Sequence, residues 1–124
     1  MISRDYSDED GIILVTATGA WSEREVDQHY EELKWEIAAR REKGLPILLL
    51  SDVTRAERQS AAVEQRTMWQ IGQTFQPGDR VAVLVADADD KAHVRGLLGA
   101  ADMAVFNSKI AAQMWLLYEG LEAP

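Results

Sequence analysis

Two short apolar runs constrain the fold more than any other feature of this sequence. Residues 47–50 read Ile-Leu-Leu-Leu, and residues 81–85 read Val-Ala-Val-Leu-Val, with no polar residue in either run. A run this short and this apolar is typical of a strand covered on both faces, as in a parallel sheet flanked by helices. The sequence therefore predicts an α/β domain.

Helix-length amphipathic segments alternate with the strand-like runs. The clearest is residues 22–43, where Ser22 and Glu25 match a capping box and Gly44 supplies a left-handed stop. The other predicted elements are strands at 2–6, 11–19, 46–52, 80–87 and 103–106, and helices at 60–75, 87–102 and 109–120. The predicted order is β-β-α-β-α-β-α-β-α, and right-handed crossovers should wind successive units the same way.

Length and charge narrow the class of protein. With 124 residues, no cysteine and no linker or repeat, residues 1–124 are expected to form one domain without a disulfide. The net charge of −8 argues against nucleic acid and anionic membrane surfaces as partners. The chain starts without a signal-peptide pattern, and no apolar run approaches the roughly 20 residues that span a bilayer. A cytoplasmic protein is expected.

This layout resembles the SpoIIAA-like superfamily, the fold of anti-sigma-factor antagonist (STAS) domains. The matching features lie at strand ends and in the last helix, over residues 11–119: Asp52, "RVAVL" at 80–84, Phe106, Ala112 and "WL" at 115–116. Within the superfamily, the likeness is to small bacterial proteins of uncertain function, some of them linked to lipid-binding Sec14 domains. The resemblance implies a single-domain β-α superhelix of about five mostly parallel strands, the first an edge strand, with four helices.

The resemblance also raises the possibility of a phosphate switch. In anti-sigma-factor antagonists, an Asp-Ser-Ser motif after this strand carries a serine that accepts phosphate at the start of the second helix. Here the stretch reads Asp52-Val53-Thr54-Arg55, so valine stands where serine is expected. Thr54 or Ser51 could replace it only after a shift along the chain. A turn or helix cap is the favoured role for these polar residues.

Aspartates follow both buried strands. Asp52 follows the first, and Asp87, Asp89 and Asp90 follow the second. If the strands are neighbours, three or four carboxylates would meet at one sheet edge and could hold Mg²⁺, with Lys109 as a counter-charge. Aspartate before a helix is also a preferred N-cap, and this reading is favoured. No catalytic residue, metal or other cofactor is expected.

One tryptophan is placed unusually. Trp35 should point away from the apolar stripe of its helix, on a face that includes Ala38 and Ala39. A large indole on a polar helix face often anchors another chain, so these residues are interface candidates in a homodimer. Incidental exposure is the alternative. Any part of the sheet left uncovered would be shielded by helices dividing between its faces, by a second subunit or by an apolar ligand.

These observations favour a non-catalytic STAS-like binding or interaction module, regulatory and self-associating, with an unidentified protein partner. Its candidate partner- or ligand-binding residues are Ser51, Asp52, Val53, Thr54, Arg55, Arg58, Trp69 and Asp87. The first alternative is a carrier of a small apolar or lipid-like ligand, in a pocket lined by Met68, Trp69, Ile71 and Phe75. The second alternative is a metal-dependent enzyme that uses the strand-tip aspartates.

Overall fold

A computed structural model describes residues 1–6, 10–99 and 101–118. Within these residues, five strands form one sheet in the order β1-β2-β3-β4-β5. The edge strand β1 (Ile2–Asp5) is antiparallel to β2 (Ile12–Gly19). The strands β3 (Leu48–Ala56), β4 (Arg80–Leu84) and β5 (Ala104–Phe106) continue the sheet in parallel. The predicted mixed sheet, with its first strand at the edge, is confirmed.

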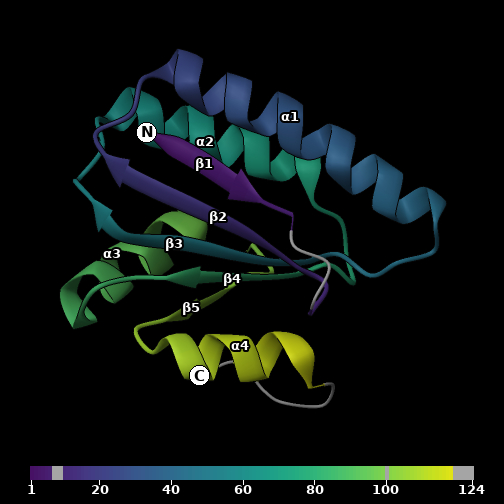
Figure 1. The fold of residues 1–124 in the computed structure, drawn as a ribbon. Helices are drawn as coiled ribbons and strands as arrows, with labels where there is room; N and C mark the ends of the chain where they lie inside the picture. Colours follow the sequence, from purple (N-terminus) through teal and green to yellow (C-terminus); the bar gives the residue numbers. More distant parts are fainter. Residues whose placement is uncertain (7–9, 100, 119–124) are drawn as a thin grey trace.

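The helices divide between the two faces of the sheet. They are α1 (Glu23–Glu42), α2 (Ala61–Thr74), α3 (Ala88–Leu98) and α4 (Lys109–Leu117). The first three connect neighbouring parallel strands in one direction, so crossovers of one hand place them on the same face. The last helix packs on the opposite face, against β3, β4 and β5 (Figure 1). Of the three ways to cover the sheet, division of the helices is therefore found. Among the described residues, α4 is the helix on its face, and it packs on β3, β4 and β5 rather than on β1 and β2.

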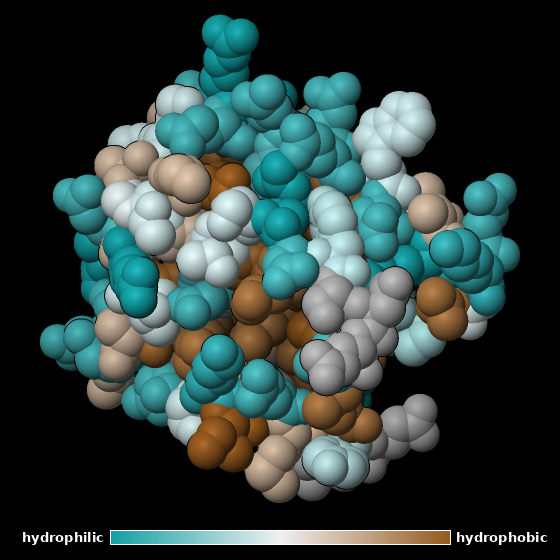
Figure 2. Space-filling model, viewed as in Figure 1, coloured by the Kyte–Doolittle hydropathy of each residue, from teal (hydrophilic) through white to brown (hydrophobic). Residues whose placement is uncertain are grey.

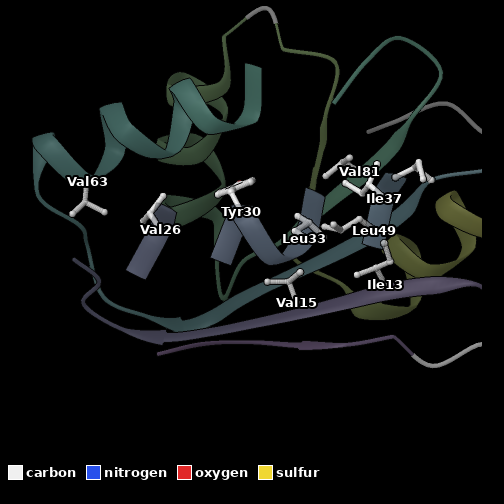
Figure 3. Close-up of a cluster of buried hydrophobic side chains, with 10 residues drawn as sticks. Ile13, Val15, Val26, Tyr30, Leu33, Ile37, Leu49, Val63 and Val81 are labelled. Carbon is white, nitrogen blue, oxygen red and sulfur yellow. The ribbon is translucent and has the colours of Figure 1, made fainter. Parts of the chain in front are cut away.

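Side-chain alternation along the strands builds a separate core on each face. On the α1 side, Ile13 and Val15 of β2 pack with Leu49 and Val81 beneath the stripe of α1 that includes Leu33 (Figure 3). On the α4 side, a second cluster contains Ile12, Leu50, Ala82, Leu84, Ala104, Phe106, Ala112 and Leu116. The runs at 47–50 and 81–85 are apolar throughout because their alternate residues enter different cores.

Helix caps follow the sequence signals in three of the four helices. Ser22 and Glu25 form the predicted capping box of α1, Asp87 caps α3 and Ser108 caps α4. The predicted role of Asp52 is wrong, because β3 continues past it to Ala56 and the cap of α2 is Ser60. Pairing with β2 sustains this extension, since β2 itself runs to Gly19, which is paired with Ala56.

Other boundaries also differ from the prediction. β4 ends at Leu84 rather than at residue 87, and its pairing with β5 reaches no further than Leu84. The third helix ends at Leu98, before the predicted end at residue 102, and Gly99 follows it with a positive φ of 53°. The predicted end of the last helix, residues 119–120, lies outside the described residues.

The face that carries α4 is partly apolar at its surface. Hydrophobic side chains gather at the centre of the face shown in Figure 2. On the α4 side of the sheet, Leu14 and Leu48 are only partly buried. The outer side of α4 adds exposed apolar residues, namely Ile110, Met114 and Leu117. This helix therefore has an inner side that packs on the sheet and an outer side that is also apolar.

Candidate functional site

A cavity of about 180 Å³ lies between the sheet and the three helices α1, α2 and α3. Its wall is largely apolar, and the strands supply its floor. The residues that line it include Tyr30, Ser51, Val53, Met68, Ile71, Val83, Val94 and Leu98. This cavity is the best-formed candidate site in the part of the chain that the structure describes.

The cavity exists because α3 covers the sheet incompletely. This helix has 11 residues, against 20 in α1, and Leu98 at its end is the residue that is buried. Val94, one turn earlier, is only partly buried against Val83 and Val85. A short helix that contacts the sheet through so few side chains leaves volume between itself, α2 and the strands.

The mouth of the cavity is polar and carries two ion pairs. Glu64 of α2 and His93 of α3 face each other across it, with Oε2 and Nε2 2.7 Å apart. Arg58, in the connection between β3 and α2, lies 3.3 Å from Asp90 of α3. Exposed ion pairs typically contribute roughly 0–1 kcal/mol each, so these pairs join α3 to its neighbours only weakly.

Three of the polar side chains that line the cavity are Tyr30, Ser51 and His29. Tyr30 of α1 is 9% exposed, and burial raises the pKa of its hydroxyl well above the usual range. Neither Tyr30 Oη nor Ser51 Oγ has a hydrogen-bond partner among the described residues. The third group is His29, which is 6% exposed and also lines the cavity.

His29 is neutral near pH 7. Burial, together with the charge of nearby Arg4, lowers its pKa to about 4. Its Nδ1 atom lies 3.0 Å from Nη1 of Arg4. A guanidinium can only donate, so Nδ1 accepts this hydrogen bond and the ring proton sits on Nε2.

The structure divides the predicted strand-tip residues between two faces. Ser51 and Val53 line the cavity. Alternation along β3 turns Asp52 and Thr54 to the opposite face, where Thr54 Oγ1 donates to Asp52 Oδ1 at 2.7 Å. These residues were expected to form one surface, and that expectation is wrong because β3 does not end at Asp52.

The other predicted binding residues lie in different surroundings. Arg58 lies at the mouth of the cavity, and Arg55 is exposed near the end of β3. Asp87 is occupied as the cap of α3, accepting from the N–H of Asp90 at 2.9 Å. Trp69 is 51% exposed on the outside of α2, with the guanidinium of Arg66 4.5 Å from its ring centre.

The pocket expected for an apolar carrier is found with one exception. Met68, Ile71 and Phe75 line the cavity, as predicted, whereas Trp69 does not. The spacing of 68 and 71 keeps these residues on one side of α2, and Phe75 follows the end of the helix. Trp69 is turned about 100° from Met68. Sequence reasoning missed Tyr30 and His29, although a tyrosine and a histidine on an otherwise apolar stripe were the available signal.

The carboxylate site suggested by the sequence is not found. The described residues include no group of three or more His, Cys, Asp or Glu side chains that could hold a metal ion. Asp52 lies on the face of the sheet opposite to α3, which carries Asp89 and Asp90. The predicted convergence at one edge is therefore wrong for these residues.

The phosphorylation candidates are also placed differently from the sequence expectation. Ser51 and Thr54 are both inside β3, so neither stands at the start of the second helix. The hydroxyl in that position belongs to Ser60, which accepts from the N–H of Val63 at 3.2 Å. Phosphorylation of Thr54 or Ser51 itself stays a prediction.

The outward orientation of Trp35 is confirmed. Its side chain is 77% exposed, Ala38 is exposed and Ala39 is partly buried. Trp35 borders a shallow depression with Arg4, Tyr6, Glu32 and Glu36. In the part of the chain that is described, no helix is both long enough and apolar enough to cross a membrane.

Comparison with known proteins finds similar proteins by structure alone. No family model matches the sequence, and no curated protein does. An uncharacterized protein of the DUF3478 family from Shewanella loihica, with a SpoIIAA-like fold, matches with a TM-score of 0.70 at 18% identity, over 94% of this chain and 92% of that chain. An anti-sigma factor antagonist from Mycobacterium paratuberculosis matches with a TM-score of 0.54 at 15% identity, over 94% of both chains.

These similarities establish the architecture. The chain has a SpoIIAA-like fold, with four parallel strands and an antiparallel edge strand within the described residues. The resemblance inferred from the strand ends and the last helix is confirmed at this level. Identities of 18% and 15% show the fold alone.

Proposed function

We propose that this chain is a non-catalytic, regulatory binding module whose ligand is a small apolar molecule held between the sheet and the helices α1, α2 and α3. The apolar cavity of about 180 Å³ is the observation that supports this proposal. Apolar wall of the cavity that stays in contact with water is unfavourable, at roughly 25 cal/mol per Å². A ligand that fills it would offset part of that cost.

The volume limits the ligand. Apolar cavities of about 150 Å³ in other proteins bind benzene, so a single-ring molecule fits here without rearrangement. Most pockets for larger ligands hold about 300–1,000 Å³, so a lipid-like chain would require α3 to move outward. The weak ion pairs Glu64–His93 and Arg58–Asp90 are compatible with such movement.

Toluene is a suitable first probe, because it is apolar and has one ring. We expect it to shift amide NMR signals of residues in α2 and α3 in the wild-type protein. Val94→Phe should abolish these shifts by filling the cavity, since Val94 lines it. Ala92→Phe is the matched control, because Ala92 is an exposed residue of the same helix.

Two results would contradict the proposal. One is the absence of toluene-induced shifts in the wild-type protein. The other is persistence of the same shifts in Val94→Phe. Native mass spectrometry of freshly purified protein would add the mass of any ligand that is carried through purification.

Docking of a protein partner is a second candidate function. One structure with this fold is named as an anti-sigma factor antagonist. The side chains of Arg55 and Arg58 are exposed at the end of β3 and in its connection to α2, and Trp69 is exposed on α2. Tryptophan and arginine are enriched among the residues that dominate protein interfaces. Trp69→Glu should then abolish binding of a stoichiometric partner captured from lysate, whereas Gln73→Glu on the same helix should not.

Several finer expectations stay predictions. They are one domain over residues 1–124, a cytoplasmic location, and a homodimer formed through Trp35, Ala38 and Ala39. The dimer has a direct test in solution, which is described in the Discussion.

A further inference from the structure

Two hydroxyl groups in the wall of the cavity have no hydrogen-bond partner among the described residues. Tyr30 and Ser51 both line it, and neither side chain forms a hydrogen bond with the residues that the structure describes. Neither oxygen is one of the fully buried side-chain atoms that lack a partner, so both are accessible from the cavity. Phenylalanine and alanine would fill these positions at lower cost, so packing alone does not explain the hydroxyls.

The two groups approach the cavity from different walls. Tyr30 belongs to the buried stripe of α1, where it lies between Val26 and Leu33 along the helix (Figure 3). Ser51 is on the floor, in the middle of the sheet, where it is paired with Val15 of β2 and Val83 of β4. Each is therefore a polar point in an apolar surrounding. His29 adds a third, because its Nε2–H has no partner among the described residues.

The charged residues of the cavity are confined to its polar mouth. Glu64 contacts His93, and Arg58 is paired with Asp90, so the guanidinium of Arg58 is not available to a ligand without breaking that pair. His29, deeper in the cavity, is uncharged near pH 7 because burial lowers its pKa to about 4. A charged ligand group inside the cavity would lack a counter-ion, and burying an unpaired charge is very unfavourable.

We infer that the ligand is a neutral molecule with an apolar body and one polar head, such as a hydroxyl or carbonyl group, which forms hydrogen bonds with Tyr30 Oη and Ser51 Oγ. This inference rests on the proposed function and specifies its ligand class. The hydroxyls orient the head, and the aliphatic side chains of β4, α2 and α3 enclose the body. Both hydroxyls can donate or accept, which suits a head of either kind.

Phenol and toluene test the inference as a matched pair, because they have nearly the same shape and differ by a hydroxyl and a methyl group. Their affinities would be measured by NMR titration of the wild type, Tyr30→Phe, Ser51→Ala and the control Tyr118→Phe. Tyr118 is an exposed tyrosine outside the cavity. Circular dichroism would verify that each variant is folded, which we expect because Tyr30→Phe removes only an unpartnered hydroxyl.

We expect phenol to bind roughly 3- to 10-fold more weakly to Tyr30→Phe and to Ser51→Ala, as for loss of one hydrogen bond. Toluene should bind these variants as well as it binds the wild type, and Tyr118→Phe should change neither probe. Benzoate, a charged molecule of similar size, should bind the wild type more weakly than phenol.

The possible outcomes distinguish failure of this inference from failure of the proposed function. If toluene binds but phenol affinity is unchanged in both variants, or both probes weaken equally, the polar-head inference is wrong and the apolar cavity stands. Tighter binding of benzoate than of phenol would overturn the neutral head. If no probe binds the wild type, the proposed function fails and the inference fails with it.

Discussion

The helices α1 and α3 cover the same face of the sheet but are attached to it in different ways. Over 20 residues, α1 buries a continuous stripe that includes Val26, Leu33 and Ile37. Over 11 residues, α3 buries Leu98 and otherwise stands above the cavity. The comparison indicates that burial under α1 supplies stability, while incomplete burial under α3 leaves space for a ligand.

The polar contacts of the two helices show the same difference. Near the C-terminal end of α1, Arg41 donates two hydrogen bonds to Asp79, at 2.9 and 2.7 Å. Near its start, Asp27 accepts two from Arg66 of α2, at 2.6 and 3.1 Å, and these hydrogen bonds hold the Asp27 pKa below its usual value. Such two-point contacts fix orientation. The pairs of α3 are single contacts at the cavity mouth.

Truncating one apolar side chain of each helix tests whether α1 and α3 contribute differently to stability. Leu33 of α1 is 1% exposed. We expect Leu33→Ala to lower the free energy of unfolding by about 2–5 kcal/mol because it leaves a new cavity in a closed core. Val94→Ala on α3 should cost less than about 1 kcal/mol, since Val94 is partly buried beside existing space. Urea unfolding would measure both, and equal losses would contradict the difference.

Burial of His29 on α1 should make the stability of the folded protein sensitive to acid. The folded-state pKa of His29 is about 4, below its unfolded value of about 6.5. The folded protein therefore binds fewer protons than the unfolded chain in this range. The contribution of neutral His29 to the free energy of unfolding is complete above about pH 6.5 and is lost as the pH falls towards 4. The groups that face it are Arg4 of β1, Tyr30 of α1 and Glu32, which pairs with Arg4.

The free energy of unfolding should fall by about 1.4 kcal/mol per pH unit between the unfolded and folded pKa values of His29, up to ~3 kcal/mol in total. His29→Gln should flatten this part of the pH dependence of unfolding. His93→Gln is the control and should keep it, because His93 is partly exposed at the cavity mouth. If both variants follow the wild-type curve, burial of His29 does not govern the acid response.

Breaking one ion pair at the cavity mouth should affect local motion more than stability. Glu64→Gln removes the charged partner of His93. We expect the unfolding free energy to change by less than about 1 kcal/mol. Hydrogen exchange of the α3 amides should become faster while that of α1 does not change. Glu31→Gln, at an exposed position on α1, is the matched control.

The smallest effect on stability is expected on the outer side of α1. Trp35 is 77% exposed, so Trp35→Glu should change the unfolding free energy by no more than about 0.5 kcal/mol. If this side of α1 joins two copies, the mass measured by light scattering should fall from dimer to monomer. A mass equal to that of the wild type would exclude Trp35 from any such interface.

Local patterns in the sequence were enough to predict the order of elements. The apolar runs at 47–50 and 81–85 indicated central parallel strands, and they form the first part of β3 and most of β4. The pair Ser22 and Glu25 marked the start of α1, because a capping box involves residues only three positions apart. Signals of this kind depend on neighbours in the chain, so they can be recognised without knowledge of the tertiary structure.

The contents of the candidate site were decided by the tertiary structure. Pairing with β2 extends β3 past Asp52, and this places Ser51 in the cavity and Asp52 on the other face. The cavity itself arises because a short α3 covers strands that a longer helix would have sealed. Strand length depends on a partner distant in the sequence, and unfilled volume depends on the fit of several elements together. Periodicity along the sequence shows neither strand length nor unfilled volume, so Tyr30 could be recognised as buried but not as part of a candidate site.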